Sequence, residues 1–414
     1  MGQHEEYDLP AGFTFINNAI NRIINEGKDN EKLTQVTGSQ IKITAISREP
    51  ISGGALTYHL QFVDFEGTVR TLYVKAKSLI IRLPDVIADL ADLGFTIYNQ
   101  KDFHHLLKIM KNDLSIPHQE TISKLGWNDS SLIFTLPYDI LKKSSNSTTY
   151  YFNNQTNYSA ISPCKSLEDY NLNVIPLIKK DNLFTFSLLT GLSTISQGLS
   201  DVENGGVHLY GDSSSGKTTA LQVFASALGS GSDPSVNPAK SSIGRFNATS
   251  NGIEGRCTAH SGIGLAIDEL GSLSAPNVGS IIYDFAGGQG KTVMNRNREL
   301  VPPETWDLIF ESTGEESIED KILGNGEQLK TGMRVRVADI PISEIDRYGG
   351  RVMNSDESRT LVENVKIMCG KYYGTLGPAF IQYIIDSYND LEEAKAAIGE
   401  LITQEKLFLE TSIP

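Results

Sequence analysis

The stretch GVHLYGDSSSGKTTAL, residues 206–221, decides the fold of this chain. It opens with an apolar run typical of a buried strand. Residues 211–218 then fit the pattern G-x-x-x-x-G-K-[ST] in full, and a helical pattern follows at once. The glycines let the backbone turn so that successive N–H groups point at phosphate oxygens, and the helix start adds partial positive charge. The stretch therefore predicts a phosphate-binding loop between a strand and a helix.

The loop predicts a nucleotide site with ATP and Mg²⁺ as cofactors. Lys217 is expected to reach the β and γ phosphates, and the Thr218 hydroxyl to bind Mg²⁺. The expected nucleotide-binding residues are Gly211, Asp212, Ser213, Ser214, Ser215, Gly216, Lys217, Thr218 and Thr219.

A second apolar run, GLAI, ends in Asp268 and Glu269. Two acids at the end of a buried strand are costly unless they emerge at the carboxyl edge of the sheet, where ligands bind. Asp268 is then expected to hold Mg²⁺ together with Thr218. Glu269 would orient and deprotonate the attacking water. The alternative is a pair of carboxylates that cap a helix.

A third predicted strand, TWDLIF, runs into Glu311, Ser312 and Thr313. A polar side chain at this strand end can reach between the loop and the acids and sense the γ phosphate. We expect Ser312 or Thr313 to do so, the alternative being that both cap the following helix.

Residues 285–292, FAGGQGKT, look like a second phosphate loop. Counting back five positions from Gly290 gives Phe285 where the pattern needs glycine, and SIIYDF before it is not a clear buried strand. The stretch therefore fails as a nucleotide loop.

Composition limits the class of protein. The chain has 414 residues and a formal net charge of −14, which argues against a surface that coats nucleic acid indiscriminately but leaves room for a local basic channel. Three widely spaced cysteines offer neither a disulfide framework nor a zinc site. The absence of a leader pattern and of a long apolar run predicts a cytoplasmic protein that contacts no membrane.

The pattern along the chain predicts three parts. Period-two alternation from about residue 40 indicates an antiparallel meander, followed by a helix ending near Gly94, a short strand FTIY and a helix around 102–113. Residues 142–159 are polar and indicate a linker or exposed hairpin. We expect an N-terminal α+β domain (1–160), an α/β core with a parallel sheet (161–345) and a short helical segment (346–414).

With these residues in place, the chain resembles the AAA+ ATPases of domain-of-unknown-function family 927, which includes the cassette chromosome helicases of mobile elements. The resemblance extends over most of the chain, to about residue 341. It rests on GWN (126–128), GVHLYGDSSSGKTTAL (206–221), FNATSNGIEG (246–255), LAIDEL (265–270), IYDFAGGQGK (282–291), WDLIFESTGEESI (306–318) and GMRVRVADIP (332–341).

This resemblance implies a P-loop AAA+ core in a homo-oligomer, expected to be a hexameric ring, in which an arginine completes the neighbouring subunit's site. Arg336 matches the family's arginine best, and Arg334 is the second candidate; the alternative is that both form surface ion pairs. The resemblance also implies a hairpin in the central channel, on which Lys291, Arg296 and Arg298 would contact the DNA backbone. The family's further arginine after GK is replaced here by Thr292.

The sequence therefore predicts a ring-forming, ATP-dependent DNA helicase or translocase of a mobile element or replication system, acting on single-stranded or forked DNA. Its N-terminal domain would be a DNA-facing or oligomerising collar. One alternative is an AAA+ regulatory or defence ATPase whose nucleotide-dependent assembly matters. Another is a nucleotide-binding scaffold without hydrolysis, which the presence of Glu269 disfavours.

Overall fold

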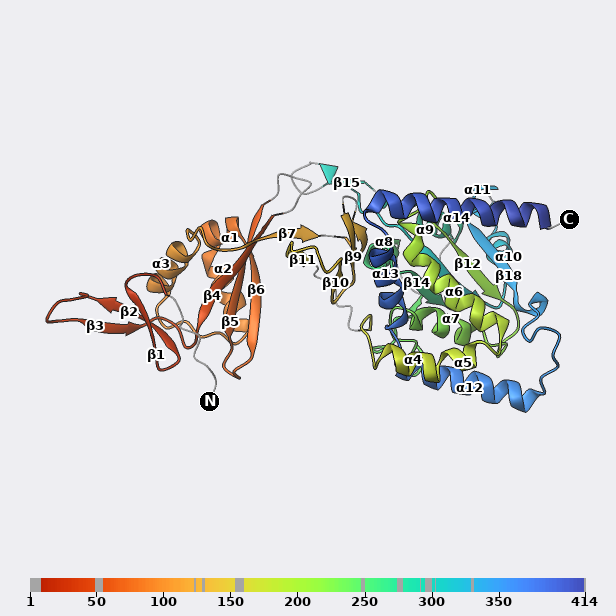
Figure 1. Ribbon diagram of the computed structural model, residues 1–414, viewed down its shortest axis with the longest axis horizontal. Coiled ribbons are helices and arrows are strands. Elements are labelled where there is room, and N and C mark those ends of the chain that lie inside the picture. Colours follow the sequence, from red (N-terminus) through yellow and green to blue (C-terminus); the bar gives the residue numbers. More distant parts are fainter. Residues whose placement is uncertain are drawn as a thin grey trace. The chain divides into compact units, whose positions relative to one another are not determined.

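The chain forms two compact units, made of residues 1–123 with 147–153 and residues 124–146 with 154–414. Figure 1 labels the helices and strands of each unit. The computed structural model describes residues 9–48, 55–122, 124–128, 131–152, 160–246, 250–273, 278–290, 292–294, 300–301, 303–328 and 331–412.

The first unit is an α+β structure. Strands β4, β5 and β6 form the antiparallel meander that the alternation predicts, and β7 and β11 extend the sheet in parallel to the order β11-β7-β4-β5-β6. A separate small sheet has the order β1-β2-β3. The elements are β1 (Phe13–Ile16), β2 (Ala19–Ile24), β3 (Lys32–Gln35), β4 (Ile41–Arg48), β5 (Leu56–Val63), β6 (Val69–Lys75), α1 (Ala76–Ile81), α2 (Leu83–Asp92), α3 (Gln100–Met110), β7 (His118–Ile122) and β11 (Tyr150–Phe152).

Two local predictions in this unit need correction. FTIY, residues 95–98, is not a strand: it makes a single bridge between Ile97 and Thr37. Its Phe95 ring is instead buried against Phe62 and Phe103 in the core, so tertiary packing overrides the β propensity. The polar stretch 142–159 contains strand β11, so part of it belongs to the sheet.

The second unit is built around a five-stranded parallel sheet of order β13-β14-β17-β12-β18. Its elements are β8 (Gly126–Asn128), β9 (Ser131–Thr135), β10 (Ile140–Leu141), α4 (Leu167–Asn173), α5 (Ile175–Ile178), α6 (Asn182–Gln197), β12 (Gly205–Tyr210), α7 (Lys217–Ser226), β13 (Gly244–Arg245), α8 (Ser250–Ala259), β14 (Leu265–Asp268), α9 (Val278–Gly287), β15 (Val293–Met294), β16 (Leu300–Val301), β17 (Ile309–Gly314), α10 (Ile318–Gly324), α11 (Thr331–Arg334), β18 (Val337–Pro341), α12 (Ser355–Lys371), α13 (Leu376–Ser387) and α14 (Leu391–Ser412).

Two hydrophobic cores lie on opposite faces of this sheet. One joins α4, α5, α6, α7 and α12 to Leu209 of β12, and the other joins α8, α9 and α10 to Phe310 of β17. The sheet is therefore covered by helices on both sides, as expected for parallel strands that alternate with helices. Because β17 lies between β12 and β14, it separates the strand before the glycine loop from the strand that ends in the acids.

The segment 124–146 lies inside the expected 1–160 domain but belongs to the second compact unit. Trp127, from the GWN motif, is buried, and its indole Nε1 donates a hydrogen bond to the carbonyl of Ile195 at 2.7 Å. Its ring packs over Gly198, where a Cβ would come within 3.0 Å of the indole. These contacts fix β8 on the end of α6. Across the described ranges, no helix is both long and apolar enough to cross a membrane.

Candidate nucleotide site

The glycine loop has the strand–loop–helix context that the sequence predicts. It begins after β12 and ends where α7 starts at Lys217, with Gly216 in the left-handed region at φ +96°. The ammonium of Lys217 donates to the carbonyls of Gly211 and Asp212, at 2.7 and 2.6 Å. Burial lowers the pKa of Lys217, while Glu315, Asp212 and Asp268 oppose that change. The lysine is therefore folded back over its own loop.

The two acids emerge at the carboxyl edge of the sheet. Asp268 is the last residue of β14, and its carboxylate accepts hydrogen bonds from the hydroxyls of Thr218, at 3.5 Å, and Thr313. Glu269 is exposed and holds a left-handed backbone at φ +70°, with its N–H donated to the Thr313 hydroxyl at 3.3 Å. A non-glycine residue in this region costs about 1–3 kcal/mol, and such strain concentrates at functional sites.

Successive side chains of a strand point to opposite faces of the sheet, so Ser312 and Thr313 of β17 lie on different faces. Thr313 faces the acids, whereas Ser312 lies on the opposite face, where its hydroxyl hydrogen-bonds His208 Nδ1 at 2.8 Å. The Nε2 of His208 contacts the carbonyl of Glu316 at 3.0 Å, and burial lowers the pKa of this histidine. Ser312 thus contributes to holding the turn after β17, while Thr313 is the one of the two that contacts Asp268 and the Glu269 N–H.

These elements line one cleft of about 1100 Å³. Residues 213–219 of the loop and helix start line it, together with Asp268, Glu269 and Thr313. Gly211 and Asp212 are not among its lining residues and contribute the carbonyls that receive Lys217.

The oxygen donors fit Mg²⁺. Thr218 and Asp268 offer a hydroxyl and a carboxylate, which are hard ligands of the kind that Mg²⁺ prefers, and Mg²⁺ sites commonly use one or two protein ligands beside substrate phosphates. Within the described residues, no group of three or more His, Cys, Asp or Glu side chains could hold a metal by itself. The site therefore suits a metal that arrives with the phosphates.

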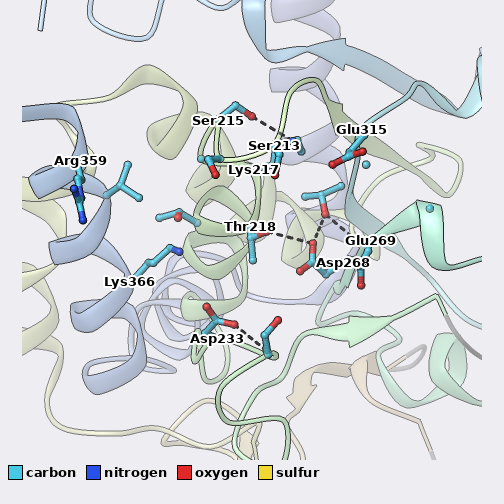
Figure 2. Close-up of a pocket in the computed structure, with 18 of the residues that line it drawn as sticks. Ser213, Ser215, Lys217, Thr218, Asp233, Asp268, Glu269, Glu315, Arg359 and Lys366 are labelled. Carbon is cyan, nitrogen blue, oxygen red and sulfur yellow. Dashed lines mark hydrogen bonds between the residues drawn. The ribbon is translucent and has the colours of Figure 1, made fainter. Parts of the chain in front are cut away.

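Sequence reasoning missed the other wall of the cleft. Arg359 and Lys366 of α12 line it, and they lie seven positions apart on one helix face. Figure 2 shows the labelled side chains of α12 on one side of the cleft and the labelled carboxylates of β14 and of the turn after β17 on the other. Arg347, in the segment between β18 and α12, also lines the cleft. None of the three lies in a sequence motif, because each is brought to the cleft only by the fold.

The two candidate arginines lie outside the cleft of their own chain. Arg336 packs over the ring of Tyr283 at 4.7 Å and donates to the carbonyl of Gly332 at 3.1 Å, with its side chain 23% exposed. Arg334 is more accessible, at 61%, and pairs with Glu319. Arg336 is therefore held more firmly by its own chain than Arg334 is.

The stretch FAGGQGKT does not form a phosphate loop. Residues 285–287 end helix α9 instead of following a strand. Beyond it, β15 and β16 pair antiparallel, as in a hairpin. The three predicted DNA contacts, Lys291, Arg296 and Arg298, lie outside the described residues.

A family model described as "Domain of unknown function (DUF927)" matches residues 13–302, which is most of the chain. The chain belongs to the DUF927 family. A search of curated proteins gives no match.

Among solved structures, this DUF927 protein is similar to one described as "SCCmec type IV Cch - active helicase", with 20% identity and a TM-score of 0.67. The match covers 92% of this chain and 66% of that one, so the chain spans slightly less than two thirds of the solved protein. The two share a fold. A structure described as the NrS-1 C terminal region in an apo form matches at 10% identity, 86% and 71% coverage and a TM-score of 0.32, too low to establish a common fold.

Proposed function

We propose that this DUF927 protein is a P-loop AAA+ ATPase that works as a ring-forming, ATP-dependent DNA helicase or translocase of a mobile element or replication system. The observation that carries the proposal is the single cleft lined by the glycine loop, by Asp268 with Glu269, and by Thr313. The fold shared with a solved helicase supports it. Strand separation itself is the further step that experiment must test.

The cleft residues have distinct proposed roles in ATP hydrolysis. The loop N–H groups and Lys217 bind the phosphates, while Thr218 and Asp268 would hold Mg²⁺, which supplies charge neutralisation when bound. Glu269 orients and deprotonates the attacking water. The Thr313 hydroxyl, which donates to Asp268, senses the γ phosphate.

The ring supplies the remaining parts. An arginine from the neighbouring subunit completes each site, and the exposure of Arg334 favours it over Arg336. Lys291, Arg296 and Arg298 contact the DNA backbone in the channel. The first compact unit is the DNA-facing or oligomerising collar.

The test compares ATP hydrolysis with and without single-stranded and forked DNA. Wild type is set beside Glu269→Gln, which should bind ATP without turnover, and beside the Lys291/Arg296/Arg298→Ala triple variant. We expect DNA to stimulate the wild type, and this stimulation to disappear in the triple variant while basal hydrolysis persists. A wild type that hydrolyses ATP at the same rate with DNA and displaces no strand would instead be a regulatory or defence ATPase.

A further inference from the structure

Arg347 joins three parts of the second unit at one guanidinium. Its Nε donates to both carboxylate oxygens of Asp181, at 3.2 and 3.0 Å, and its Nη2 also donates to Asp181. Its Nη1 donates to the carbonyl of Ser215, in the glycine loop, at 2.9 Å. The segment after β18, the start of α6 and the phosphate loop therefore meet at this side chain.

The guanidinium is held in one position. Asp181 is fully buried, and it also accepts the backbone N–H of Leu183 at 3.0 Å as the N-cap of α6. The rings of Phe184 and Tyr348 each lie 5.5 Å from the guanidinium carbon. A planar fork with a buried carboxylate and two aromatic neighbours has little freedom to move.

The contact with Ser215 fixes the direction of one loop peptide. In a trans peptide the C=O and the next N–H point in opposite directions, so a Ser215 carbonyl held by Arg347 turns the N–H of Gly216 away from the arginine. Gly216 lies in the left-handed region at φ +96°, which disfavours a side chain, and a Cβ there would also come within 3.3 Å of Arg347 Nη2. The arginine thus fixes the orientation of this peptide from the Ser215 side.

We propose that Arg347, anchored by Asp181, is a positioning residue that presets the phosphate loop for the phosphate chain of a nucleotide. The proposal rests on the proposed nucleotide binding at this cleft. The loss of Arg347 should therefore weaken nucleotide binding, because a preset loop avoids the cost of ordering its N–H groups when phosphate binds.

The test variant is Arg347→Lys, which keeps a cation beside Asp181 but cannot bond Asp181 and the Ser215 carbonyl as a planar fork does. The probe is a fluorescent ADP with Mg²⁺, and ATP hydrolysis supplies KM and kcat. We expect the Kd for ADP and the KM for ATP to rise about tenfold, with kcat falling less than threefold. Arg351→Lys, an exposed arginine in the same segment, is the matched control and should bind like wild type.

Further variants separate the possible failures. If wild type binds ADP, Lys217→Ala loses it and Arg347→Lys binds with the wild-type Kd, the positioning role is wrong and the nucleotide site stands. If wild type does not bind ADP, the proposed function itself fails. Should Arg347→Lys not fold, Asp181→Asn decides: it can still cap α6 but loses the charge that anchors the fork, and a Kd equal to that of wild type would overturn the proposal.

Discussion

Glu311 should make the second unit less stable as the pH rises towards neutrality. Its side chain, in the middle of β17, is completely buried, and neither oxygen has a hydrogen bond partner among the described residues. Burial raises the pKa of Glu311 from 4.5 to about 8. The nearby hydroxyl of Ser187 lowers the pKa of Glu311 and so opposes part of this rise. The Ser187 hydroxyl is itself buried and makes no well-formed hydrogen bond to the described residues.

The sign follows from proton linkage. The folded chain keeps the Glu311 proton up to about pH 8, whereas the unfolded chain loses it near pH 4.5. The stabilising effect is therefore complete below pH 4.5 and disappears as the pH rises through 8. At about 1.4 kcal/mol for each pH unit, the whole effect is about 5 kcal/mol, of which about 3 kcal/mol falls between pH 5 and 7.5.

Urea unfolding of wild type and Glu311→Gln, followed by tryptophan fluorescence at pH 5 to 7.5, measures this effect. Both tryptophans, Trp127 and Trp306, lie in the second unit, so the signal reports on that unit alone. Glutamine has no proton to lose, and the free energy of unfolding of the wild type should therefore fall by about 3 kcal/mol relative to the variant over this range. Glu405→Gln, at an exposed position of α14, should show no such trend. A constant difference between wild type and Glu311→Gln would refute the reasoning.

Three further outcomes follow from contacts in the second unit. Thr313→Val removes the hydroxyl on Asp268 and should slow ATP hydrolysis about 10- to 100-fold with ATP affinity retained, whereas Ser312→Ala, on the other face, should slow it less. Arg334→Ala should lower hydrolysis by about 10³-fold or more, and regain activity when mixed with subunits that carry the arginine but lack Glu269; a larger loss in Arg336→Ala would reverse the assignment. Gly262→Ala puts a Cβ within 2.5 Å of the backbone of β8 at φ +71°, and should lower the unfolding free energy by roughly 2 kcal/mol in the same fluorescence assay.

The sequence predicts correctly those elements whose pattern lies entirely within one short stretch of the chain. The loop at 211–218 combines glycine spacing with a strand before it and a helix after it, all within sixteen residues, so no tertiary information was needed. The meander of β4, β5 and β6 was likewise visible as alternation. The FTIY prediction fails because three apolar residues around a threonine suit either a strand or a core loop, and the packing of Phe95 decides between them.

The rest of the site depends on the register of the sheet and on contacts between distant segments. Ser312 and Thr313 are adjacent and chemically alike, and the pairing of β17 with β12 and β14 determines which one faces Asp268. Arg347 bonds a loop residue 132 positions earlier in the chain. The buried acid that anchors it, Asp181, looks in the sequence like an ordinary helix cap. The neighbouring sequence does not distinguish Arg347 from an arginine on the surface.

The charged side chains that line the cleft determine which form of a nucleotide suits it. Six carboxylates against four cations give a formal balance of −2. Arg347 is paired with Asp181, Arg359 with Glu363, and the carboxylate of Glu316 with Lys321. If the cleft binds ATP as proposed, a free ATP tetra-anion would meet net repulsion there, and a nucleotide whose charge is partly neutralised by a divalent cation would be favoured. The backbone N–H groups of the loop, which carry no formal charge, are then the natural phosphate ligands, because they attract anions without pairing with the acids. On the proposed function, the acidic wall is left to orient water, and the surplus of carboxylates selects the magnesium complex over the free nucleotide.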